Sequence, residues 1–248
     1  MRIASRIALG QASGKTLAGV ARKMLQVRFM PIGILGSGRV GRALGAGLVR
    51  VGRDVIIGSR EPGREELRAW AERMYGGISV SGIQEAAELC TMAIVAVPWS
   101  AVSDTANVVG AAPLRSKVVI DATNPVVFAS PREPKFALNG GLSGGEMVQH
   151  LFPESFVVKA FNSIAHTHMV HPVFPDGLPD MLICGDDDKA KGLVSELCQA
   201  LGWATIDVGG ISSSRYLEGL GMLGVLVSQR MGSNDHAFTL LRKEPDER

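Results

Sequence analysis

The sequence predicts an α/β protein with a Rossmann doubly wound parallel sheet, followed by a small C-terminal α+β domain. From residue 32 onward, short apolar runs alternate with amphipathic stretches, which is the pattern of βαβ units. Glycine makes up 30 of the 248 residues and suits the many tight turns that join strands to helices in such folds. The first apolar run leads directly into the GxGxxG sequence Gly36-Ser37-Gly38-Arg39-Val40-Gly41.

Hydrophobic periodicity places the elements along the chain. Short apolar runs predict strands near residues 32–35, 54–57, 78–80, 92–97, 117–121 and 156–161. The amphipathic stretches between them predict helices near 40–51, 64–75, 83–89, 101–109 and 145–151. The last of these helices follows Ser143 and has Glu146 three residues later, which indicates a capping box at its N-terminus.

The spacing of the elements changes after residue 161. Pro172, Pro175 and Pro179 mark a connection, after which we expect a strand at 181–184, a helix at 188–201, a strand at 204–208 and an apolar helix from Ser214. The chain therefore divides into a leader over residues 1–29, a Rossmann domain over 30–165 and a small C-terminal domain over 166–248.

Basic charge is concentrated in the leader. Residues 1–29 hold six basic residues and no acidic one, which suits an organelle transit peptide; Met30, directly before the first strand, equally suits an over-extended start. The rest of the chain holds 20 basic and 24 acidic residues, so its charge balance does not predict nucleic-acid binding. No apolar run reaches the roughly 18 to 20 residues of a membrane span, so no membrane partner is expected.

The cysteines and histidines do not form a recognisable metal site. Cys90, Cys184 and Cys198 lie far apart in apolar stretches, so we expect buried free thiols and a reducing compartment. The expected location is the cytoplasm, or an organelle if the leader directs import. The histidines at 166, 168 and 171 do not share one helical face, and no supporting ligand is nearby in the sequence, so no metal is predicted.

The GxGxxG sequence predicts a dinucleotide site because it follows a strand and opens a helix. Gly36 permits the tight turn, Gly38 lets the backbone approach a diphosphate, and Gly41 lets the helix pack closely against the strand. The free N–H groups and the positive dipole end of the helix would hold the diphosphate.

The end of the second strand indicates which nicotinamide cofactor is bound. About 20 residues after the motif, an Asp or Glu would bind the ribose 2′-OH of NAD. This chain has Ser59 and Arg60 there, and Arg64 follows one helical turn later. A hydroxyl and two guanidinium groups suit a 2′-phosphate, which predicts NADP(H). Glu61 would oppose this preference unless its carboxylate turns outward.

Two more loops are expected to line the groove at the carboxyl ends of the strands. Val97 and Pro98 follow the fourth strand, and Thr123 and Asn124 follow the fifth. Proline makes the first loop rigid, and Asn124 can hydrogen-bond a carboxamide or a ribose, although Asn and Pro are also common in ordinary turns.

Together these residues resemble the family of coenzyme F420-dependent NADP oxidoreductases, whose Rossmann domain also occurs in a class of metalloreductases. The resemblance covers residues 32 to 242. Besides the glycine motif it rests on Gly58-Ser59-Arg60, Val97-Pro98-Trp99, Ser143-Gly144-Gly145-Glu146, Val158-Lys159-Ala160-Phe161-Asn162, and the segments 184–188 and 207–215. The chain departs from the family pattern at Glu61, where a second basic residue is frequent, and over residues 121–128.

The resemblance implies that residues 37–40, Ser59, Arg60 and Arg64 hold NADP, with further contacts at Val97, Thr123 and Ala160. It also implies a deazaflavin stacked on the nicotinamide. Hydride transfer between stacked rings needs close carbons and excluded water, so no catalytic side chain is predicted.

The expected function is therefore an NADP(H)-dependent oxidoreductase that exchanges a hydride with a flavin-like acceptor such as coenzyme F420. An NADPH-dependent flavin or ferric-chelate reductase and a non-catalytic NADP(H)-sensing module are the alternatives. Expected walls for the second ring are Pro98, Trp99, Asn162 and the helix around Leu220, Met222 and Leu223. Such an apolar helix is more often simply core or dimer interface. A homodimer through that helix is expected from Gly219, Gly221 and Gly224, which permit close approach.

Overall fold

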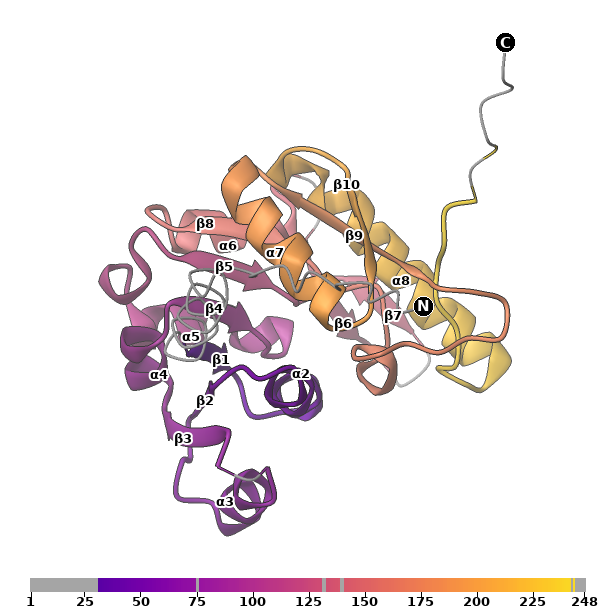
Figure 1. Ribbon diagram of the computed structural model, residues 1–248. Coiled ribbons are helices and arrows are strands. Elements are labelled where there is room, and N and C mark those ends of the chain that lie inside the picture. Colours follow the sequence, from indigo (N-terminus) through magenta and orange to yellow (C-terminus); the bar gives the residue numbers. More distant parts are fainter. Residues whose placement is uncertain (1–30, 75, 131–132, 139–140, 242, 244–248) are drawn as a thin grey trace, which may run out of the picture.

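The computed structural model describes residues 31–241 and 243, apart from 75, 131–132 and 139–140 (Figure 1). The leader predicted at 1–29 lies outside the described residues. Eight strands form one sheet in the order β10-β9-β8-β5-β4-β1-β2-β3. In chain order they are β1 (Ile32–Leu35), β2 (Val55–Ser59), β3 (Ile78–Gly82), β4 (Met92–Val95), β5 (Val118–Asp121), β8 (Phe156–Lys159), β9 (Asp180–Gly185) and β10 (Ala204–Asp207).

All neighbouring strands of this sheet are parallel except β8 and β9, which are antiparallel. The central strands β1 and β5 are buried along their whole length, as expected for a parallel sheet covered on both faces. This arrangement confirms the α/β, Rossmann-like fold class.

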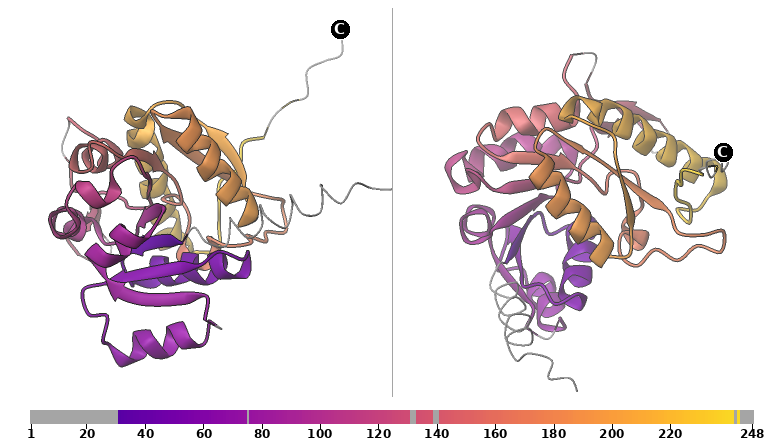
Figure 2. Two further views of the ribbon diagram at one scale, coloured as in Figure 1. Left: turned by 60° about the vertical axis from the view of Figure 1, so that its left-hand side comes forward. Right: turned by 45° about the horizontal axis from the view of Figure 1, so that its top comes forward.

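Helices cover both faces of the sheet (Figures 1 and 2). One buried apolar cluster joins the sheet to α2, α3 and α7, and a second joins it to α4, α5 and α6. Among the described residues the longest helix is α8, which follows the last strand. The helices are α2 (Arg39–Arg50), α3 (Glu65–Glu72), α4 (Ile83–Leu89), α5 (Val102–Val109), α6 (Gly144–Leu151), α7 (Asp188–Ala200) and α8 (Ser214–Met231).

The C-terminal segment extends the Rossmann sheet. The boundary proposed between residues 165 and 166 falls between β8 and β9, and these two strands are hydrogen bonded to each other. The first apolar cluster contains Ile34 from β1 together with Met181 from β9 and Trp203 before β10. The division into two domains at residue 165 remains a prediction.

Local differences from the predicted elements have physical reasons. The strand predicted at 156–161 ends at Lys159, because Phe161 adopts a left-handed backbone with φ of 63°. The helix predicted at 64–75 spans only Glu65–Glu72, and Gly76 shortly after it has φ of 79°.

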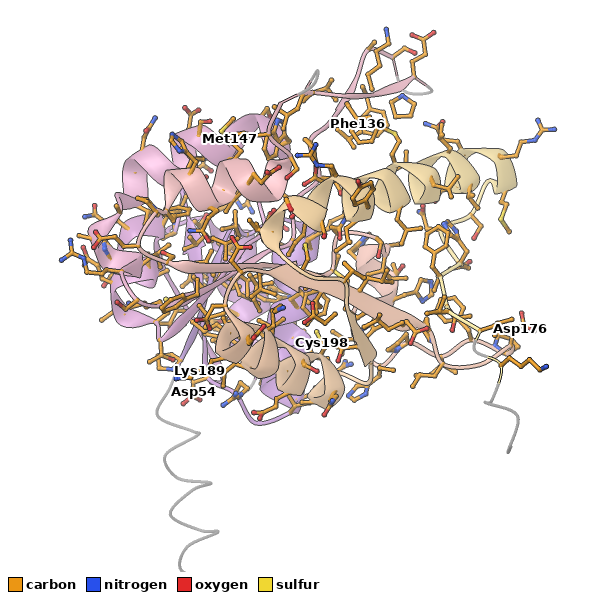
Figure 3. All side chains as sticks on the ribbon, turned by 90° about the horizontal axis from the view of Figure 1, so that it is seen from above. Asp54, Phe136, Met147, Asp176, Lys189 and Cys198 are labelled. Carbon is orange, nitrogen blue, oxygen red and sulfur yellow. The ribbon has the colours of Figure 1, made fainter. Side chains whose placement is uncertain are left out.

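A small antiparallel hairpin of β6 (Val126–Phe128) and β7 (Pro134–Phe136) was not predicted. Its strands are only three residues long, and Pro134 begins the second, as is common in edge strands. The hairpin lies beside α8, and Figure 3 shows Phe136 on it.

Candidate functional site

The glycine motif forms a tight turn between β1 and α2. Gly36 has φ of 127°, and a Cβ added there would lie 2.4 Å from the backbone oxygen of Ala96. A Cβ at Gly41 would lie 2.1 Å from the backbone oxygen of Gly36. Gly38, by contrast, has open space where its Cβ would be. Two glycines therefore permit the turn and its packing, and the third leaves room for a ligand beside the backbone.

The N-terminus of α2 is available for an anion. Its N-cap residue, Gly38, has no side chain to cap the helix, and the first turn contains no acidic residue. Arg42 stabilises the turn, because its Nε donates a hydrogen bond to the backbone oxygen of Ser37 at 3.1 Å. Its Nη1 also donates to Glu66 Oε1 at 2.7 Å. The unpaired N–H groups of this first turn are the kind of site that binds a phosphate.

A cavity of about 280 Å³ lies over this turn, and we call it the glycine-loop cavity. It contains eight of the predicted cofactor-binding residues, together with Glu61. These eight are Gly36, Ser37, Gly38, Ser59, Arg60, Arg64, Val97 and Pro98. Arg39, Val40 and Gly41 continue directly into α2.

The end of β2 brings a hydroxyl and two guanidinium groups to the rim of this cavity. Ser59 is buried, its Oγ lies 3.1 Å from Ser37 Oγ, and it accepts a hydrogen bond from the Glu61 N–H at 3.2 Å. Arg60, Glu61 and Arg64 are exposed around it. The rim thus carries two positive charges and one negative charge.

The remaining predicted residues lie at the next strand ends along the same edge. Thr123, after β5, and Ala160, after β8, are buried, with exposures of 3% and 0%. Asn124 is turned toward the loop after β8, because its Nδ2 donates to the backbone oxygen of Asn162 at 2.6 Å. None of these three residues lines the glycine-loop cavity.

A second cavity of about 340 Å³ lies beside Asn124 and Asn162. Residues 163–165 and α8 also line it, and so does the segment 233–241 that follows α8, which we call the C-terminal strap. We call this space the strap cavity. Leu220, Met222 and Leu223 of α8, predicted as walls for a second ring, do not line it; Gly221 and Gly224 do. Trp99, another predicted wall, lines neither cavity and packs near Gly144.

A buried ion network supports the loops between the two cavities. The Nζ of Lys159 lies 2.6 Å from Asp121 Oδ2 and 2.9 Å from Glu218 Oε1, and it donates to the backbone oxygen of Thr123 at 3.0 Å. The three charged side chains are at most 4% exposed. Glu218 also accepts from the N–H groups of Gly144 and Gly145, the first two residues of α6.

The two carboxylates stabilise the charged form of Lys159. Burial alone would lower the pKa of Lys159, but the carboxylates of Asp121 and Glu218 outweigh burial and hold that pKa above its ordinary value. Sequence reasoning missed this network. The signal was present, because a lysine or glutamate inside an otherwise apolar strand or helix requires a partner when it is buried.

The three thiols lie in the protein interior. All three cysteines are free and buried. Burial raises the pKa of Cys198 to about 12, and it also raises the pKa of Cys90 and of Cys184. Within the part of the chain that the structure describes, no three His, Cys, Asp or Glu side chains gather as metal ligands.

The described residues also contain no helix long and apolar enough to cross a membrane.

The fold and the glycine-loop cavity define a Rossmann protein that binds dinucleotides. Residues 31–125 match the family model described as NADP oxidoreductase coenzyme F420-dependent. The F420-dependent NADP reductase of Methanothermobacter marburgensis is 31% identical over 199 residues, an alignment that covers 76% of this chain and 88% of the relative. The chain belongs to the family of F420-dependent NADP oxidoreductases, which are NADP-binding oxidoreductases.

Two further similarities extend this result. Metalloreductase STEAP3 of Rattus norvegicus is 33% identical over 194 residues, covering 76% of this chain but only 36% of the metalloreductase. The chain thus spans about a third of the length of that relative. A crystal structure from Arthrobacter sp. FB24, of a protein provisionally assigned as an F420-dependent NADP reductase, has a TM-score of 0.80 and 28% identity. That superposition covers 85% of this chain and 99% of the other.

Proposed function

We propose that this protein transfers a hydride between NADP(H) and a flavin-like acceptor such as coenzyme F420. The observation that carries the proposal is that two cavities lie at the carboxyl edge of one sheet. The glycine-loop cavity has an uncapped helix N-terminus and two arginines at its rim. The similarity to an F420-dependent NADP reductase over 88% of that protein's length supports the same acceptor class.

The residues of the glycine-loop cavity fit NADP. The open side of Gly38 and the first turn of α2 suit the diphosphate, and Ser59, Arg60 and Arg64 suit the 2′-phosphate. The strand ends lie in a row between this cavity and the strap cavity, and they carry Val97, Pro98, Thr123, Asn124 and Ala160.

NADPH supplies a hydride, and a proton from water completes the two-electron reduction of a deazaflavin, so that NADPH, one proton and oxidised F420 give NADP⁺ and reduced F420. The protein needs to hold the two rings together and exclude water. No side-chain acid or base is required for that task.

The direct test mixes the full chain with NADPH and oxidised coenzyme F420 without oxygen and follows the visible absorbance of the deazaflavin. We expect rapid bleaching that depends on both the protein and NADPH. If NADPH binds but F420 is not bleached, the proposed acceptor is wrong.

The 33% sequence identity to metalloreductase STEAP3 favours a second candidate function, an NADPH-dependent reductase of flavins or ferric chelates. The same assay with FMN, or with ferric citrate and a ferrous-iron indicator, tests it. Binding of NADPH without oxidation by any of these acceptors would instead support an NADP(H)-sensing module.

We further propose that the protein forms a homodimer through α8. Of the three glycines from which a dimer was expected, Gly221 and Gly224 are buried against loops of their own chain, whereas Gly219 is partly exposed with open space beside it. The outer side of the helix carries the exposed apolar residues Tyr216, Leu223 and Leu226. Sedimentation equilibrium tests the proposal, and a molar mass near 26.3 kDa at micromolar concentration would contradict it.

A further inference from the structure

The strap cavity is lined by a buried amide whose oxygen has no partner. Asn162 is only 6% exposed, and its Nδ2 donates to Asn124 Oδ1 at 3.0 Å and to the backbone oxygen of Leu217 at 2.8 Å. Both bonds need an N–H donor, so they fix which end of the amide is nitrogen. Oδ1 of Asn162 is left buried without a hydrogen bond. A buried acceptor without a partner is uncommon in proteins and points to a donor on a ligand.

The position of Asn162 is imposed by its neighbours. Phe161, directly before it, is held in the left-handed region with φ of 63°, which is unfavourable for a residue other than glycine. The Phe161 side chain is completely buried, so packing maintains this backbone. Local strain of this kind is concentrated at binding sites, where it directs a side chain.

The C-terminal strap contributes a second lining residue that has an unpaired polar atom. His236 lines the strap cavity, and its Nδ1 is buried without a hydrogen-bond partner. The strap turns back along α8 (Figure 1) and is anchored on both sides of this histidine. Before it, Asp235 Oδ1 lies 2.9 Å from His168 Nε2; after it, Asp180 Oδ2 accepts from the Leu240 N–H at 2.7 Å.

Glycines leave the space open on the α8 side. A Cβ at Gly224 would lie 3.6 Å from Phe238 and 3.7 Å from His236 Nε2, which is ordinary contact distance. A Cβ at Gly221 would lie 2.8 Å from Asn124 Oδ1 and would clash. The cavity is therefore bounded by the α8 backbone on one side, and Asn162 and His236 are among its other lining residues.

We propose that Asn162 and His236 select the hydride acceptor by the edge of its ring, an inference that rests on the proposed function. Asn162 Oδ1 accepts a hydrogen bond from a ring N–H, and His236 Nδ1 donates one to the adjoining ring carbonyl. The ligand class is a heteroaromatic ring with neighbouring N–H and C=O groups, as in flavins and deazaflavins. Ferric chelates of carboxylates have no such N–H donor.

The first test changes the ligand and leaves the protein intact. Lumiflavin and 3-methyllumiflavin differ only in whether the ring nitrogen between the two carbonyls carries hydrogen or methyl. We expect lumiflavin to bind the NADP⁺-saturated full chain, measured by quenching of its fluorescence. A lost hydrogen bond and a buried oxygen left unpaired should weaken the methylated ring about tenfold. Equal binding of both rings, or no binding of lumiflavin, would overturn the proposal.

The second test changes the strap. His236→Phe keeps a ring beside Phe238 but removes Nδ1, and we expect it to raise the KM for the acceptor about fivefold with the NADPH dissociation constant unchanged. His236→Asn places an amide near the position of Nδ1 and should restore the KM to within about twofold of the unmodified protein. If both variants behave alike, His236 has no role in selection.

A matched pair of alanine variants tests the cavity itself. Gly224→Ala adds a methyl group to its α8 wall and should raise the KM for the acceptor, whereas Gly219→Ala adds the same group to open space on the same helix. Equal KM values for the two variants would contradict the location.

The proposed hydride transfer and the selection of the acceptor by Asn162 and His236 are distinguished by their outcomes. If the full chain with NADPH bleaches no F420 and no flavin, the proposed function fails. If bleaching occurs but neither 3-methylation of the ring nor the His236 and Gly224 variants change acceptor binding, only this selection by Asn162 and His236 fails.

Discussion

At the scale of single residues, Arg60 is the clearest test of cofactor choice. It is exposed at the rim of the glycine-loop cavity, directly after the buried Ser59 at the end of β2. We expect Arg60→Ala to weaken NADPH binding by about 2 kcal/mol, roughly thirtyfold, because charge-assisted hydrogen bonds to the 2′-phosphate are lost. Binding of NADH, which lacks that phosphate, should change little. Fluorescence titration of both cofactors measures the difference.

The control for this variant is Arg73→Ala, which removes an exposed arginine just after α3, outside the cavity. It should leave both dissociation constants unchanged. Equal losses for NADPH and NADH in the Arg60 variant would show that the guanidinium does not recognise the 2′-phosphate.

Replacing Glu61 should strengthen NADPH binding, whereas replacing Arg60 should weaken it. Its carboxylate belongs to the same cavity rim as Arg60 and Arg64, and it would repel a bound phosphate. We expect Glu61→Gln to strengthen NADPH binding by up to about 1 kcal/mol, roughly fivefold, with a smaller gain at high salt because exposed charges are screened. Titrations at two ionic strengths measure this effect. Weaker NADPH binding in the variant would mean that Glu61 positions the cofactor.

At the scale of elements, the Lys159 network joins two strands, β5 and β8, to the helices α6 and α8. Lys159→Met would leave the carboxylates of Asp121 and Glu218 buried without their cation. We expect a loss of about 3 to 5 kcal/mol in the free energy of unfolding, measured by urea denaturation. The matched control is Arg115→Met, which breaks an exposed ion pair with Glu154 and should cost less than about 1 kcal/mol.

The contribution of Lys159 to the free energy of unfolding should decrease at high pH. Because the pKa of Lys159 is raised in the folded protein, its contribution to stability is complete below the ordinary value of 10.5 and is lost as the pH rises through the folded value. The stability gap between Lys159→Met and the unmodified protein should therefore be constant from pH 7 to 9 and shrink above about pH 10.5. A gap that closes near neutral pH would contradict an ionised network.

Elements with strong periodicity were predictable from sequence, whereas residues that depend on tertiary partners were not. The strand before Gly36 and the helix after it follow from local apolar spacing and from one glycine motif, so they could be placed within a residue or two. The left-handed Phe161 and the partners of Lys159 depend on packing against β9 and α8, which are remote in sequence. The role of His236 in lining a cavity likewise depends on where the C-terminal strap lies.

At the scale of the whole molecule, the sequence predicted the parallel Rossmann sheet but not how its C-terminal part joins it. Periodicity located strands near 181–184 and 204–208 without indicating their neighbours. In the structure β9 pairs with β8 in antiparallel orientation, and β10 pairs with β9. Strand order depends on contacts between distant segments, and a single sequence carries little direct information about them.

This shared sheet leads to a prediction about cooperativity. The first apolar cluster includes Ile34 and Leu44 from the N-terminal segment with Met181, Val194 and Trp203 from the C-terminal one, all at most 3% exposed. Separating the segments at residue 165 would expose both sides of that cluster to water, at roughly 25 cal/mol for each Å² of apolar surface. We therefore expect a single thermal unfolding transition, with the same midpoint by circular dichroism and by tryptophan fluorescence, which reports on Trp70, Trp99 and Trp203. Two separable transitions, or a residue 30–165 fragment that unfolds cooperatively by itself, would instead establish two independent domains.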